Sequence, residues 1–177
     1  MSDHDNVTRR EMIQIGTAAT LAVAGAKSDL ASEPAPKFFT KEEFAMVDEL
    51  TELIIPADDH SPGARAALVA PYIDGRLAVS FEEEPKKSWR EGLARIDSLS
   101  REMHGQSFMR ANTEQRVALL TRISKNEDHP QTPEEHFFKM LKGYTARAYY
   151  TSKIGIHQEM EYKGNVLLQE FVGYEVK

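Results

Sequence analysis

The chain has 177 residues, of which 41% are apolar, with 22 Lys and Arg against 28 Asp and Glu and no cysteine. This length and balance fit one globular domain. The net charge of −6 argues against a surface that binds duplex nucleic acid, because phosphate contacts need a basic face. The lack of cysteine excludes disulfides, thiolate metal sites, Cys-ligated iron–sulfur clusters and a Cys nucleophile.

Residues 1–26 have the pattern of an export signal. Arg9 and Arg10 precede an uncharged run of 15 residues between Glu11 and Lys27. This run is shorter than the roughly 20 apolar residues of a membrane span, and it ends in small residues that suit a signal peptidase. An arginine pair ahead of a mildly apolar run is typical of a twin-arginine signal. We therefore expect a periplasmic protein without a transmembrane helix after cleavage, and an exposed leader at residues 27–37.

The twin-arginine route carries proteins that are already folded, often with a cofactor inserted. This chain shows no dinucleotide-binding or phosphate-binding glycine motif and no haem or cluster ligands. Either the cofactor occupies a site without a sequence signature, or the chain is exported together with a partner that holds it. We favour the second interpretation.

Apolar residues at three- and four-residue spacing predict helices in the first half of the mature chain. A helix is expected to follow the Thr40–Glu43 capping box and to end before Pro56. A loop then leads to a short apolar segment that includes Leu68, Tyr72 and Leu77. The next helix is expected to start at the acidic residues 82–84 and to end at Gly105.

Two further helices are expected in the second half. One follows Asn112, with Val117, Leu120 and Ile123 facing inward, and the other follows Thr132 and continues to residue 149. The last 26 residues have no clear period, apart from one or two helical turns near residues 165–171. The sequence therefore predicts an all-α fold, a compact bundle of five or six helices with an irregular C-terminal tail.

The most ligand-like cluster is Asp58-Asp59-His60, in a loop bounded by prolines. Two carboxylates and an imidazole could serve a small metal-dependent hydrolase. The same residue types are ordinary turn formers before Pro-Gly, so we favour a structured or interface loop. The histidines match no metalloprotease or zinc-finger spacing, and no catalytic, cofactor-binding or metal-binding residue is predicted.

Two segments resemble a known family. They are residues 53–64, which read Leu-Ile-Ile-Pro-Ala-Asp-Asp-His-Ser-Pro-Gly-Ala, and residues 149–156, which read Tyr-Tyr-Thr-Ser-Lys-Ile-Gly-Ile and continue to Glu161–Asn165. Together they are similar to the gluconate 2-dehydrogenase subunit 3 family. The resemblance spans nearly the whole chain and implies a helical subunit-3-like domain at residues 38–177.

The resemblance also implies a function. Members of this family are small exported subunits of FAD-dependent sugar or sugar-acid dehydrogenases. The large partner is a flavoprotein of the glucose–methanol–choline type, and electrons leave through a c-type cytochrome that carries haem. The small subunit has no catalytic residues. The residues that it would place at the interface with the flavoprotein are Pro56, Asp58, Asp59, Pro62, Gly63, Tyr150, Thr151, Gly155, Gly164 and Asn165.

The sequence thus predicts a non-catalytic accessory subunit of a periplasmic dehydrogenase that acts on a sugar, glycoside or sugar acid. Its expected role is the export, folding and stability of the flavoprotein, with any membrane association through the complex. Two alternatives stay open, a free-standing periplasmic binding module and the hydrolase at Asp58, Asp59 and His60.

Overall fold

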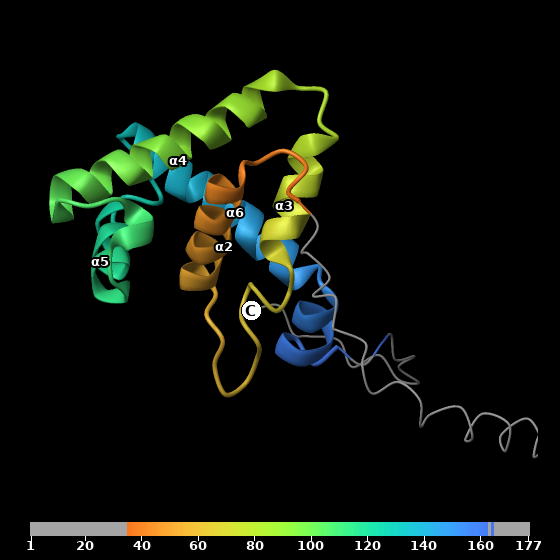
Figure 1. Ribbon diagram of the computed structural model, residues 1–177. Coiled ribbons are helices and arrows are strands. Elements are labelled where there is room, and N and C mark those ends of the chain that lie inside the picture. The colour runs from red at the N-terminus through yellow and green to blue at the C-terminus, as the bar shows by residue number, and fades with distance from the viewer. Residues whose placement is uncertain (1–34, 163, 165–177) are drawn as a thin grey trace, which may run out of the picture. The chain divides into compact units, whose positions relative to one another are not determined.

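The computed structural model describes residues 35–162 and 164, and these residues form helices and loops without a strand (Figure 1). The elements, in chain order, are α2 (Lys41–Ile54), α3 (Val69–Ala78), α4 (Glu83–His104), the 3₁₀ turn η1 (Phe108–Arg110), α5 (Thr113–Ser124), α6 (Pro133–Tyr150) and the π-helical turn η2 (Gly155–Glu159). The predicted all-α bundle is confirmed. The predicted turns near residues 165–171, the signal and most of the leader lie outside the described residues.

Local signals start and end most of these helices. A complete capping box opens α2, α5 and α6, formed by the pairs Thr40–Glu43, Asn112–Gln115 and Thr132–Glu135. In each pair the cap side chain accepts the N3 amide, and the N3 side chain accepts the cap amide, so two otherwise unpaired donors are satisfied. Gly105 ends α4 in the left-handed conformation, with φ 71°, which glycine adopts without strain.

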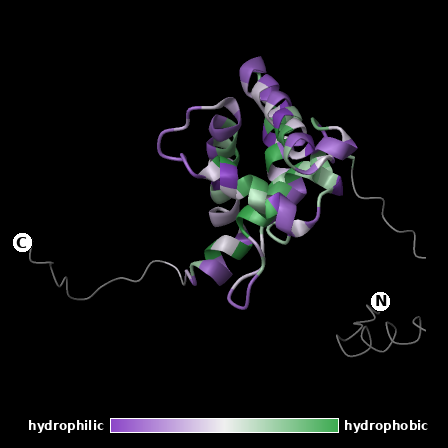
Figure 2. Ribbon diagram, turned by 90° about the vertical axis from the view of Figure 1, so that its left-hand side faces the viewer, coloured by the Kyte–Doolittle hydropathy of each residue, from purple (hydrophilic) through white to green (hydrophobic). Residues whose placement is uncertain are grey.

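The core lies where α6 packs against α2, α3, α4 and α5. In Figure 1, α6 passes behind α2 and α3, and Figure 2 shows apolar residues on the helix sides that face one another. Trp89 of α4 is fully buried and makes edge-to-face contacts with Phe39, Phe137 and Tyr144. Such aromatic pairs add to the free energy gained from burying the rings themselves. The apolar stripes predicted for α2, α4 and α6 form this core.

The predicted inner face of α5 is wrong at one residue. Leu120 and Ile123 are buried as expected, but Val117 is 46% exposed and Leu119 takes its place in the core. The reason is that α5 packs on both α4 and α6, so its buried stripe includes the neighbouring residues 119 and 120. Val117 lies outside that stripe.

Asp74 on α3 fixes the start of the domain. Its buried carboxylate accepts hydrogen bonds from the backbone amides of Lys37, Phe38 and Phe39, at 2.7, 3.0 and 3.0 Å. A buried carboxylate is costly unless its lone pairs are used, and three amide donors satisfy this one. The bonds hold Phe39 against Trp89.

Among the residues that the structure describes, no helix is both long and apolar enough to span a bilayer.

Replacing Asp74 by Ala leaves three backbone amides without their acceptor. We expect the free energy of unfolding in urea to fall by about 2–3 kcal/mol. Asp74→Asn keeps the side-chain volume but has one acceptor oxygen in place of two, so its loss should be smaller. Equal stability of Asp74→Ala and the wild type would show that these bonds do not hold residues 37–39.

Candidate partner-binding site

The loop after α2 is shaped by the Asp58 carboxylate. Its Oδ1 accepts hydrogen bonds from the amides of His60 and Ser61 at 2.9 and 2.8 Å, and the Asp58 amide donates to the Ser61 carbonyl at 3.0 Å. These bonds, first the one from Ser61 and then the one from His60, lower the pKa of Asp58. The carboxylate therefore stays charged and holds a tight turn of the kind that Asp favours.

Gly63 lets this loop fold back on α2. The Glu52 carboxylate accepts the amides of Ala57 and Arg65 at 3.3 and 2.7 Å and so joins the two ends of the loop. A Cβ at Gly63 would overlap this carboxylate and lie 2.5 Å from the Ala57 nitrogen. Position 63 therefore has no room for a side chain. Gly63 is buried because the two ends of the loop approach each other closely.

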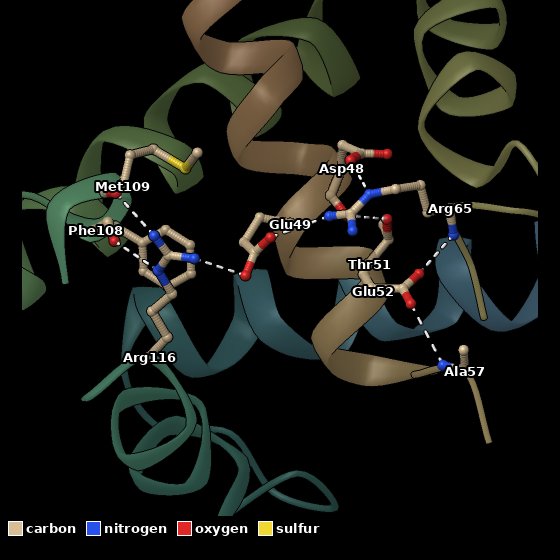
Figure 3. Close-up of polar contacts among 9 residues, drawn as sticks. All are labelled: Asp48, Glu49, Thr51, Glu52, Ala57, Arg65, Phe108, Met109 and Arg116. Atoms are coloured by element: carbon tan, nitrogen blue, oxygen red, sulfur yellow. Dashed lines mark hydrogen bonds and ion pairs between the residues drawn. The ribbon is translucent and has the colours of Figure 1, made fainter. Parts of the chain in front are cut away.

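A chain of charges anchors the far end of the loop (Figure 3). Arg65 donates to Asp48 and, at 3.0 Å, to Glu49 on α2. Glu49 also accepts Arg116 of α5 at 2.6 Å, and Arg116 donates to the carbonyls of Phe108 and Met109. Since Arg116 and Glu49 are largely shielded from water, this bridge is screened less than a surface ion pair. It links the loop, α2, η1 and α5.

The second predicted segment begins where α6 ends. The Thr151 hydroxyl donates to the Arg147 carbonyl at 2.7 Å, and the Ser152 hydroxyl accepts the Gly155 amide at 3.0 Å. A Cβ at Gly155 would overlap the Tyr149 carbonyl. Glycine at 155 therefore allows η2 to pack directly against the end of α6.

Tyr149 joins the two segments. Its buried hydroxyl donates to the Pro62 carbonyl at 2.8 Å and is hydrogen-bonded to the buried Ser61 hydroxyl. A second link forms at the surface, where His60 Nε2 lies 3.2 Å from the Glu159 carbonyl. This hydrogen bond, with the nearby carboxylates of Glu159, Glu161 and Asp58, raises the pKa of His60. We call the surface formed by residues 56–64, 150–151 and 155–162 the junction face.

The predicted interface residues divide into two groups. Pro56, Asp58, Asp59, Tyr150, Thr151 and Gly164 are exposed, whereas Pro62 is half-buried and Gly63 and Gly155 are buried. The buried glycines can act on a partner only through the shape of the loops. Asn165 and the signal residues Arg9 and Arg10 lie outside the described residues.

Several residues that build the junction face were not singled out by their sequence pattern. Ser61 and Glu52 look like ordinary polar residues, and Tyr149 is expected only as a core aromatic. Neighbouring positions on a helix cannot both face inward, and of this pair Tyr149 is 1% and Tyr150 43% exposed. Met160 is half-exposed beside the loop that carries Glu161.

The cluster Asp58-Asp59-His60 does not form a metal site in this structure. Oδ1 of Asp58 accepts two backbone amides, and the His60 ring is directed to the Glu159 carbonyl. Within residues 35–162 and 164, no group of three or more His, Asp and Glu side chains is arranged to hold an ion.

Removing the Tyr149 hydroxyl tests how much the hydrogen bonds between the two segments stabilise the fold. Tyr149→Phe leaves the buried Ser61 hydroxyl and the Pro62 carbonyl without their partner, so the free energy of unfolding should fall by about 1–2 kcal/mol. Tyr150→Phe is the matched control and should leave it unchanged, because Tyr150 is exposed. An equal, small effect of both changes in urea denaturation would show that the joint contributes nothing.

Comparison with known proteins places the chain in a family. The sequence model described as gluconate 2-dehydrogenase subunit 3 matches residues 41–166, which include both segments of the junction face. No curated protein and no solved structure matches the chain. The match covers most of the 177 residues, from the start of α2 to beyond the last described residue. The chain therefore belongs to the gluconate 2-dehydrogenase subunit 3 family, a family of accessory subunits of dehydrogenase complexes.

Proposed function

We propose that the chain is the non-catalytic small subunit of a periplasmic FAD-dependent dehydrogenase of the glucose–methanol–choline type. The enzyme would oxidise a sugar, a glycoside or a sugar acid, and the small subunit would serve the export, folding and stability of the flavoprotein. The observation that carries the proposal is the joint at Tyr149. The hydrogen bonds of its hydroxyl to Ser61 and Pro62 connect the two segments that resemble the family. Both segments lie within the region that the family model matches.

The chemistry of the junction face supports its use as a protein interface. Exposed apolar groups, Tyr150 and Met160, lie on the same segments as the exposed carboxylates Asp58, Asp59 and Glu161. Interfaces combine aromatic and Met side chains with a polar rim. An acidic rim favours a partner surface with Lys or Arg around an apolar centre, since complementary charges speed association and fix orientation.

The signal pattern of residues 1–26 supports the export role. Arg9 and Arg10 ahead of an uncharged run fit the twin-arginine route, which would carry this chain already folded with its flavoprotein. In this proposal FAD belongs to the flavoprotein and haem c to a cytochrome that takes the electrons. The small subunit then contributes binding surface and a signal, while the chemistry takes place in its partners.

The two alternatives receive less support. A hydrolase at Asp58, Asp59 and His60 would need side chains that are free to bind an ion, whereas two of them are engaged in the loop and in the link to η2. A free-standing binding module would be purified without a flavoprotein. Purification of the tagged chain therefore tests this alternative directly.

The tagged full-length chain, purified from its native periplasm, should co-elute with a larger flavoprotein in roughly stoichiometric amount. The eluate should show a flavin absorption spectrum and sugar-dependent dehydrogenase activity, and the isolated chain should show none. A colourless, solitary protein, or turnover by the isolated chain, would contradict the proposal.

Charge reversal on the junction face should weaken this complex. We expect Asp59→Lys combined with Glu161→Lys to raise the Kd for the flavoprotein by about tenfold, mainly through a slower association rate. Glu91→Lys combined with Glu102→Lys is the control of equal charge, because both residues are exposed on α4. Equal loss of affinity in the two double variants would show that net charge matters and the junction face does not.

A further inference from the structure

The His60 ring connects the loop after α2 with η2. Its Nε2 lies 3.2 Å from the carbonyl oxygen of Glu159, 99 positions later in the chain. A carbonyl oxygen can only accept, so this hydrogen bond requires a proton on Nε2. The imidazolium always carries that proton, whereas the neutral ring carries it in only one of its two tautomers. Protonation of His60 therefore secures the donor, and the added charge strengthens the hydrogen bond.

The surroundings of the ring favour the charged form. The hydrogen bond to the Glu159 carbonyl raises the pKa of His60 above its ordinary value of 6.5, and the nearby carboxylates of Glu159, Glu161 and Asp58 raise it further. The ring therefore changes its charge close to neutral pH. The other charged or titratable side chains of the two segments and of the adjoining end of α6 are Asp59, Lys153, His157, Tyr162, Arg147 and Tyr150.

The η2 segment buries little of its surface. Of its five residues, Gly155 alone is buried. Glu161, which follows η2, has φ 47°, a left-handed conformation that residues other than glycine rarely adopt. A segment with few buried apolar contacts opens locally at a small cost in free energy, and strain in the turn after it reduces this cost. A single hydrogen bond whose strength depends on protonation can therefore shift the balance between a closed and an open η2.

We propose that His60 and the Glu159 carbonyl form a pH-sensitive latch, which holds η2 and residues 160–162 on the loop when the imidazole is protonated and weakens as the proton is lost. A group whose pKa is raised in the closed segment stabilises that segment fully below its ordinary pKa, and the contribution is lost as the pH rises through the raised value. The latch belongs to this chain alone, so it does not depend on the proposed function. It makes the order of residues 155–162, which are part of the junction face, depend on pH.

Hydrogen–deuterium exchange of the full-length chain measures the opening of η2. Protection factors, which correct for the base catalysis of exchange itself, are compared between about pH 5.5 and about pH 8.5, where Asp and Glu side chains stay charged. In the wild type we expect the protection of amides 155–162 to fall by about two- to fivefold as the pH rises, the range of an exposed charge contact. The protection of α5 should stay constant.

Two glutamine variants assign this effect to one residue. His60→Gln should abolish the fall in protection, because glutamine does not titrate. His157→Gln is the matched control, since it removes the exposed histidine of η2 itself, and it should keep the pH dependence of the wild type.

The titration of the His60 ring, followed by NMR, provides a second measurement. Glu161→Gln removes one of the carboxylates that favour the imidazolium, so the pKa of His60 should be lower in this variant. Glu91→Gln, exposed on α4, should leave it unchanged. The latch would be overturned by protection that is independent of pH in the wild type, by a pH dependence that persists in His60→Gln or disappears in His157→Gln, or by an equal His60 titration in Glu161→Gln and the wild type.

Discussion

The buried hydrogen bonds of the Tyr149 hydroxyl are the constraint on which the candidate site depends. The hydroxyl meets the Ser61 hydroxyl and the Pro62 carbonyl, which lie 88 and 87 positions earlier in the chain. Because a buried polar group is costly without a partner, the loop after α2 and the end of α6 stabilise each other's position. Either segment alone would be a surface loop of its own. Together they form one face with a defined shape.

Close backbone approach completes this arrangement. Gly63 brings the loop against Glu52, and Gly155 brings η2 against the Tyr149 carbonyl, so each motif has a glycine at the point where a Cβ would collide. Gly75 and Gly143 are different, since a Cβ at either position would meet nothing within 4 Å among the described residues. The contrast separates the two glycines at which the site leaves no room for a side chain from helix glycines with open space around them.

Much of the fold could be predicted because its signals are local. The Thr40 and Thr132 caps, the end of α4 at Gly105 and the inner stripes of α4 and α6 each depend on residues within a few positions of one another. Val117 was assigned wrongly because three- and four-residue spacing fits more than one face of a short helix, and the packing of α4 and α6 decides between them. The resemblance singled out two segments, and the structure brings them into contact. Their connection could not be predicted, because the bonds from Tyr149 to Ser61 and from His60 to Glu159 join residues about half the chain apart.

In the function that we propose, the two segments form one face and the flavoprotein binds it. Hydrogen–deuterium exchange of the full-length chain, alone and in its purified complex, tests this most directly. We predict slower exchange in the complex at the amides of both residues 56–64 and residues 155–162, with α5 unchanged. Slower exchange confined to one segment, or found at α5 and absent from the junction face, would contradict the account.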